Sequence, residues 1–195
     1  TILRYFVPIL SVAVSANPNS GTNPLAGVDL TASVGGTATG NIVYKFDCAN
    51  DGTFEHTSVA TAQTTYTATD LCTYDTAGAY TAKIEATRGG LTATNTTTIT
   101  VTQRTLTISL SADPSTGTNP LDSNLTATVG GNATGDIIYK FDCTNDGTFE
   151  FTSPATSQTS YTSSCNYPEV GNYTAKVVAA RQGLSAENTA SISVI

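Results

Sequence analysis

The sequence predicts an all-β protein made of two tandem antiparallel β-sandwiches, and three observations support this prediction. Small hydroxyl residues are abundant, with 38 Thr and 17 Ser among 195 residues, a composition that favours strands and turns over helices. Apolar residues alternate with polar ones, which is the period of a strand with one buried face. Finally, the segment 44–55 returns as 139–150 with 11 of 12 residues identical, so the chain contains two homologous modules.

Further duplicated blocks define the module boundaries. Two of these blocks, which begin at residues 15 and 79, return at residues 111 and 172. We therefore place the first module at 10–101 and the second at 106–195, joined by a linker at 102–105. Residues 1–9 precede the first module and form a separate N-terminal segment.

Strands of the first module are expected where alternate residues are apolar, at 30–34, 42–46, 80–86 and 99–101. Turn signals lie between these runs, at Asn17-Pro18, Asn23-Pro24, Gly35-Gly36, Asp51-Gly52 and Ala77-Gly78. About seven short strands per module, with no segment of helical period, are typical of an antiparallel sandwich.

An aromatic pair followed by an Asp-Gly turn resembles a known family. Tyr44 and Phe46 precede Asp51-Gly52-Thr53, and the block from Gly78 to Lys83 reads Gly-x-Tyr-Thr-Ala-Lys. These residues, with their copies in the second module, resemble the immunoglobulin-like PKD (polycystic kidney disease) domain. The usual Trp of that family is Tyr44 here, and residues 47–50 are inserted before the Asp-Gly, so the chain is similar to a cysteine-containing variant. The resemblance implies a surface or secreted spacer, adhesion or assembly module without catalysis.

Four cysteines allow three pairings, and the duplication favours one of them. Cys48 and Cys143 occupy one repeat position, and Cys72 and Cys165 occupy another. We therefore predict the disulfides Cys48–Cys72 and Cys143–Cys165, each stabilising its module by roughly 3 kcal/mol. Buried free thiols and a zinc site are the competing interpretations, although the sequence has no CxxC motif. Paired disulfides predict an extracellular or cell-surface location.

No catalytic constellation is recognisable in the sequence. A Ser or Cys nucleophile needs a histidine base, and the only histidine, His56, is replaced by Phe151 in the repeat. We therefore expect no enzymatic activity and no cofactor. A net charge of −7 with only 8 Lys and Arg residues predicts no nucleic-acid partner.

A duplicated acidic loop follows the aromatic pair of each module. Its oxygen-bearing side chains are Asp47, Asn50 and Asp51 in the first copy and Asp142, Asn145 and Asp146 in the second. Oxygen ligands beside a turn glycine suit calcium. However, Ala49 or Thr144 fills the middle ligand position, so we favour side chains that cap their own turn, with calcium as the alternative.

The sequence contains four acceptor motifs for N-linked glycosylation, at Asn95, Asn124, Asn132 and Asn172. Their number is close to what the high Ser and Thr content produces by chance. The predicted extracellular setting makes covalent glycans at these residues a candidate modification.

The N-terminal segment is the main departure from the repeat. Its apolar and aromatic side chains are Ile2, Leu3, Tyr5, Phe6, Val7 and Ile9. The segment is too short to span a membrane and lacks the pattern of a signal peptide, so we expect no membrane insertion. Two interpretations are open: the segment packs in cis as a first strand of its own module, or it adds in trans as a strand to another copy.

Two functions from different classes fit these features. In the first, the protein is a structural subunit of an extracellular fibre or surface appendage, and copies associate head to tail through residues 1–9. In the second, it is a tandem spacer or adhesion module of a larger secreted protein with weak glycan binding. The first requires a self-complementary end, whereas the second requires only polar linkers, so the N-terminal segment favours the fibre.

Overall fold

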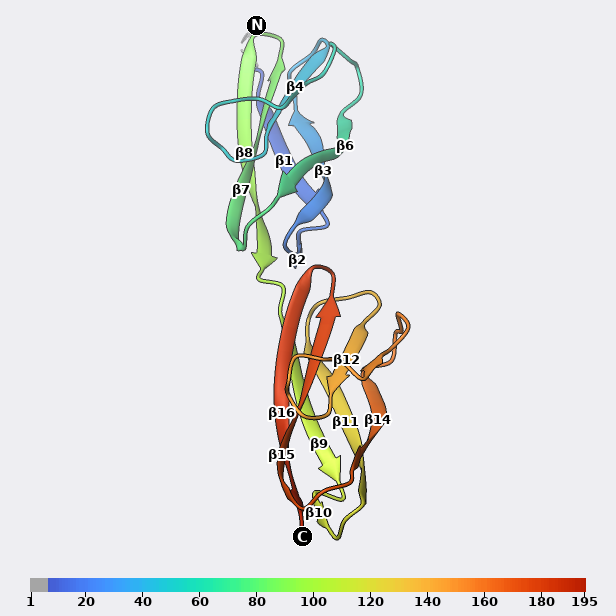
Figure 1. The fold of residues 1–195 in the computed structure, drawn as a ribbon. Helices are drawn as coiled ribbons and strands as arrows, with labels where there is room; N and C mark the ends of the chain where they lie inside the picture. The colour runs from blue at the N-terminus through green and yellow to red at the C-terminus, as the bar shows by residue number, and fades with distance from the viewer. Residues whose placement is uncertain (1–6) are drawn as a thin grey trace, which may run out of the picture. The chain divides into compact units, whose positions relative to one another are not determined.

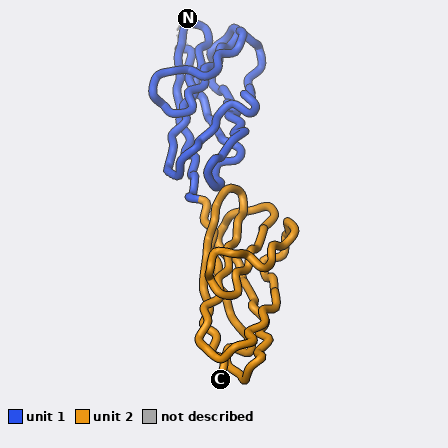
Figure 2. Tube along the Cα trace, viewed as in Figure 1, with its two compact units in different colours: residues 1–103 blue, residues 104–195 orange. Residues whose placement is uncertain are grey.

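The computed structural model describes residues 7–195, which belong to two compact units at 1–103 and 104–195 (Figure 2). The boundary falls inside the linker expected at 102–105. Four of the side chains expected to mediate assembly, Ile2, Leu3, Tyr5 and Phe6, lie outside the described residues.

The first unit is a sandwich of two β-sheets (Figure 1). One sheet has the order β1-β3-β6, formed by β1 (Leu10–Asn17), β3 (Leu25–Gly36) and β6 (Thr65–Tyr74). The other has the order β2-β8-β7-β4-β5, formed by β2 (Ser20–Thr22), β8 (Leu91–Thr102), β7 (Gly78–Arg88), β4 (Ile42–Asp47) and β5 (His56–Thr57).

The second unit repeats this arrangement. Its first sheet has the order β9-β11-β14, formed by β9 (Leu106–Asp113), β11 (Leu121–Gly131) and β14 (Ser160–Tyr167). Its second sheet has the order β10-β16-β15-β12-β13, formed by β10 (Thr116–Gly117), β16 (Leu184–Val194), β15 (Gly171–Arg181), β12 (Ile138–Asp142) and β13 (Phe151–Thr152). The described residues contain no helix, and therefore no helix that could cross a membrane.

The strand order is that of an immunoglobulin-like fold. In chain order β1, β3, β4, β6, β7 and β8 take the positions A, B, C, E, F and G, with A, B and E in one sheet and C, F and G in the other. The predicted fold class, two tandem immunoglobulin-like sandwiches, is therefore confirmed. Strand D, which pairs with E in the constant-type fold, has no counterpart among the described strands of either unit.

One pairing in each unit departs from the expected antiparallel pattern. β2 runs parallel to β8, and β10 runs parallel to β16. The physical reason is that the chain leaves the first sheet after β1 or β9 and joins the edge of the second sheet, where it lies beside the last strand of the unit. These parallel pairs are short, with three residues in β2 and two in β10.

Alternate residues of the long strands form the core, as the period of two predicts. In the first unit Tyr44 and Phe46 of β4 are fully buried, whereas Lys45 between them is only partly buried. Tyr139 and Phe141 of β12 are buried in the same way in the second unit. Each such side chain contributes about 1.5–3 kcal/mol by its removal from water.

A tyrosine near the start of β7 and of β15, the strands at the F position, forms a hydrogen bond with the turn that precedes its strand. The Tyr80 hydroxyl of β7 donates to the Thr76 carbonyl at 2.9 Å, and the Tyr173 hydroxyl of β15 donates to the Glu169 carbonyl at 3.0 Å. This is the tyrosine corner of immunoglobulin-like sandwiches, which links the two sheets at that end of the unit.

The two units differ along one strand pair. β3 and β6 shift register twice, between Leu25 and Val28 and between Val28 and Leu30. Gly27 and Asp70 adopt positive φ angles of 69° and 51° at this irregularity. In contrast, β11 and β14 pair without a shift over eight residues. The first unit therefore carries a β-bulge that the second unit lacks.

Candidate functional site

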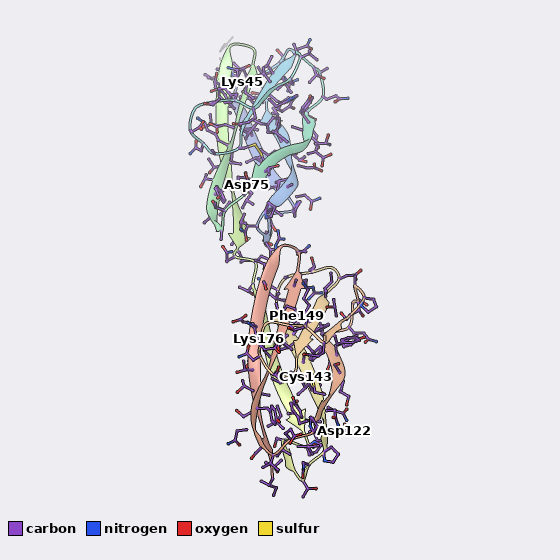
Figure 3. All side chains as sticks on the ribbon, viewed as in Figure 1. Lys45, Asp75, Asp122, Cys143, Phe149 and Lys176 are labelled. Carbon is purple, nitrogen blue, oxygen red and sulfur yellow. A yellow bond between two sulfur atoms is a disulfide. The ribbon has the colours of Figure 1, made fainter. Side chains whose placement is uncertain are left out.

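The four cysteines join the two sheets of each unit. Cys48 follows β4 and bonds to Cys72 of β6, and Cys143 follows β12 and bonds to Cys165 of β14 (Figure 3). The Cα atoms are 5.8 Å apart in both pairs, and the cysteines of β6 and β14 are almost fully buried. All cysteines of the chain are in these bonds. In antibody domains the inter-sheet bond joins strands B and F instead.

The acidic loop of the first unit is organised by a buried carboxylate. Asp47 accepts hydrogen bonds from the backbone N–H groups of Ala49, Asp51 and Gly52 at 3.1, 3.2 and 2.9 Å. Burial by itself raises the pKa of Asp47, but these N–H groups, with that of Asn50, outweigh burial and hold the pKa below its ordinary value. The side chain therefore works as an ionised cap of its own turn.

A glutamate completes this loop, and it was absent from the expected ligand set. The Glu55 carboxylate accepts the backbone N–H of Cys48 at 2.6 Å, and the Glu150 carboxylate accepts that of Cys143 at 2.7 Å. These bonds position the chain at the start of each disulfide. The signal that pointed to Glu55 was its identity in the two copies of the block 44–55.

The loop of the second unit brings three carboxylates together. Oxygen atoms of Asp142, Asp146 and Glu150 lie within 4.8 Å of one another. Asp142 accepts the N–H groups of Thr144, Asp146 and Gly147 at 3.3, 3.2 and 2.9 Å. The backbone N–H of Thr148, with the side chains of Thr148 and Thr144, lowers the pKa of Asp146. The carboxylate pair expected as calcium ligands thus already has donors from its own backbone.

The asparagines of the expected calcium set have a backbone role. Asn50 and Asn145 adopt φ angles of 53° and 57°, a left-handed conformation that Asn tolerates better than most residues. They let the chain turn so that the following N–H groups point at Asp47 or Asp142. This arrangement supports a turn capped by its own side chains.

The only histidine is part of an aromatic cluster. His56 Nε2 lies 2.9 Å from the Tyr66 hydroxyl, and the two rings stack with centroids 5.6 Å apart. In the second unit Phe151 stacks on Tyr161 at 5.7 Å. The position is therefore one of packing between the two sheets, with a polar contact in the first unit and an apolar one in the second.

The four glycosylation motifs present exposed asparagines that differ in their contacts. Asn95 Nδ2 donates to the Val12 carbonyl at 2.9 Å, and Asn132 Oδ1 accepts the Thr105 N–H at 2.7 Å. Asn188 repeats the first contact by donating to the Ile108 carbonyl at 2.9 Å, although it is outside any acceptor motif. The contact of Asn95 is thus a shared structural feature of both units.

Two shallow hollows lie on the described surface. The first, about 300 Å³, is bordered by the Cys48–Cys72 bond, Tyr74, Tyr80 and Glu55. The second, about 350 Å³, is lined by Ser115, Thr116, Asn172, Tyr173, Thr174, Ser191, Ile192 and Ser193. The lining of the second hollow combines hydroxyl groups with an aromatic ring, and Asn172 of a glycosylation motif is part of it.

The described end of the N-terminal segment is exposed. Val7 and Ile9 have 73% and 60% of their surface in contact with solvent. However, the backbone of Ile9 belongs to the first unit, because its carbonyl accepts the N–H groups of Thr37 and Ala38 at 2.9 and 3.0 Å. The Thr105 carbonyl accepts the Ala133 N–H at the same point of the second unit. Ile9, which we counted with the N-terminal segment, therefore belongs to the sandwich of the first unit.

Comparisons with known proteins concern the fold alone. No protein-family model matches the sequence, and no curated protein matches it. Among solved structures, the chain is similar to a chimeric titin Z1Z2 fragment functionalised with a KLER peptide from decorin, with 17% identity over 93% of this chain and 96% of that one and a TM-score of 0.37. It is also similar to an I-band fragment of titin, with 16% identity over 97% of this chain and 66% of that one and a TM-score of 0.38.

Proposed function

We propose that this protein is a non-enzymatic structural subunit of an extracellular fibre or cell-surface appendage, and that its copies assemble head to tail through the N-terminal segment. In this proposal each sandwich is a PKD-like module in a cysteine-containing form. Two inter-sheet disulfides are consistent with an extracellular location. The satisfied carboxylates and the stacked His56 support a scaffold role rather than catalysis.

The completeness of the first unit carries this proposal. β1 begins at Leu10 and pairs residue by residue with β3, from Leu10 opposite Gly36 to Asn17 opposite Asp29. The sandwich therefore already has its first strand without residues 1–7. An apolar segment of this kind is costly to leave in water, since each large side chain gains about 1.5–3 kcal/mol on burial.

Association of this segment with another copy makes a contact between two different surfaces of the same protein. Such a heterologous contact produces an open filament unless its geometry closes a ring. A chain that lacks residues 1–7 and keeps Ile9 should give folded monomers, whereas the full chain should form fibres visible by negative-stain microscopy. A full chain that stays monomeric at high concentration would refute the proposal.

The second hollow favours one alternative function. Its hydroxyl groups and the ring of Tyr173 offer hydrogen bonds and a stacking surface, which is the chemistry of a sugar site. In that case the protein is a spacer or adhesion module of a larger secreted protein with weak glycan binding. In this alternative a monomeric full chain binds glycans on an array. Tyr173→Phe should leave this binding intact, and Ser191→Tyr should abolish it.

A further inference from the structure

We propose that the outer edge of β14 is the acceptor for residues 1–7 of a neighbouring copy. The inference rests on the proposed function, because it names the acceptor surface of the same head-to-tail contact. β14 takes the E position, and among the described strands it pairs with β11 alone (Figure 1). The place beside it, which strand D fills in a constant-type immunoglobulin domain, is therefore open to a strand from outside.

The backbone of β14 presents a regular row of hydrogen-bonding groups at this edge. The Val129 N–H donates to the Thr159 carbonyl at 2.8 Å, which identifies the residues of odd number as those bonded to β11. The N–H and C=O groups of the even-numbered residues therefore point away from β11. These residues are Ser160, Thr162, Ser164 and Asn166, and they form a ladder of about 20 Å.

The corresponding edge of the first unit is less suited to a strand. β6 carries the register shifts opposite Val28 and the left-handed Asp70, and such a bulge interrupts the row of outward groups. The edges of β1 and β9 are covered at one carbonyl each, because Asn95 and Asn188 donate to Val12 and Ile108.

The side chains beside the β6 edge and the β14 edge also differ, and this difference again favours β14 as the acceptor. In the first unit His56 and Tyr66 are joined by a hydrogen bond beside the β6 edge, so this rim is polar. In the second unit Phe151 stacks on Tyr161 beside the β14 edge, and both rings are only partly buried. An incoming apolar side chain therefore gains contact at the second unit without displacing a hydrogen bond.

The occupant follows from the chemistry of residues 1–7 and from the position of Pro8. Residues 1–7 run up to Pro8, where a ring nitrogen without a hydrogen cannot continue a ladder, so a strand formed by this segment ends there. As a strand, the segment would place Leu3, Tyr5 and Val7 on one side and Ile2, Arg4 and Phe6 on the other. Either side offers at least two apolar groups to the rim of Phe151 and Tyr161.

A proline in the edge tests the acceptor with a matched control. Thr162→Pro removes an outward N–H of β14, and Thr67→Pro removes the equivalent N–H of β6. Both residues lose the same cross-strand contact, because Thr162 and Thr67 each share a 2.9 Å hydrogen bond with a threonine of the neighbouring strand. Proline is tolerated at an edge where the N–H faces solvent. We expect the full-length T162P protein to stay monomeric and the T67P protein to form fibres.

Hydrogen exchange provides a second readout that does not depend on a variant. The amides of residues 160, 162, 164 and 166 should exchange about tenfold or more slowly in fibres than in monomers without residues 1–7, and those of residues 65 and 67 should not change. Fibres from T162P, or unprotected β14 amides in wild-type fibres, would overturn the β14 acceptor and leave the fibre proposal standing. Fibres from the chain without residues 1–7 would instead refute the proposed function itself.

Discussion

The buried residue that pairs with Cys72 in the first unit, or with Cys165 in the second, gives the sharpest test of what an unsatisfied hydroxyl costs in stability. Val28 pairs with Cys72 in the first unit, and Ser123 pairs with Cys165 in the second. Both side chains are fully buried, with 0% exposure, but the Ser123 hydroxyl has no hydrogen-bond partner in the described structure. An unsatisfied buried hydroxyl costs about 1–3 kcal/mol.

Ser123→Val should therefore stabilise the second unit, because it replaces the hydroxyl by the side chain that the first unit uses. We expect a gain of about 1–2 kcal/mol once some crowding by the extra methyl group is allowed for. For a unit of this size each kcal/mol raises the melting temperature by about 4–8 °C.

Differential scanning calorimetry of the full chain measures this change. The reciprocal variant Val28→Ser is the matched control and should destabilise the first unit by about 2–4 kcal/mol, from the lost packing and the new unsatisfied hydroxyl. An S123V protein that is less stable than wild type would refute the reasoning, since it would mean that the serine hydroxyl has a favourable partner.

Four further predictions concern the disulfides, the titration of Tyr74 and of Asp47, and the acidic loops. Cys143→Ser should lower the stability of the second unit by about 2–5 kcal/mol in denaturant unfolding, and peptide mapping without reduction should recover the pairs Cys48–Cys72 and Cys143–Cys165 from wild type. Burial, with smaller contributions from Glu55, Tyr80 and Asp47, raises the pKa of Tyr74 to about 12. The contribution of Tyr74 to the free energy of unfolding is therefore fully present below about pH 10 and is lost as the pH rises through 12. Tyr74→Phe should weaken this loss of stability at alkaline pH. The pKa of Asp47 is lowered, so its contribution is present above about pH 4 and is lost as the pH falls below that value, and Asp47→Asn should flatten the acid limb of the stability curve. Chelation with EDTA should leave the melting temperature nearly unchanged, whereas a drop of about ten degrees or more would indicate a bound cation in the acidic loops.

The amino-acid sequence alone determined the fold class, the two modules and the equivalence of the cysteines. These properties depend on local periodicity and on duplication, both of which can be read along the chain. Tyr44 and Phe46 alternate with polar neighbours, and this pattern predicts which face of β4 is buried. The repeat positions of Cys48 and Cys72 likewise predict the pairing that the sandwich contains.

Only the tertiary structure decided which groups meet across the two sheets and which edges remain open. The bond that Asn95 of β8 donates to the Val12 carbonyl of β1 joins residues whose proximity depends on strand order, and strand order has no period in the sequence. The bulge at Val28 and its absence at Ser123 follow from small differences in length between the copies, whose effect appears only when β3 or β11 pairs with its neighbour. Thr67 and Thr162 are identical in type and both direct their N–H groups outward, yet they lie on edges of different character, because the β3–β6 pair contains the bulge and the β11–β14 pair does not.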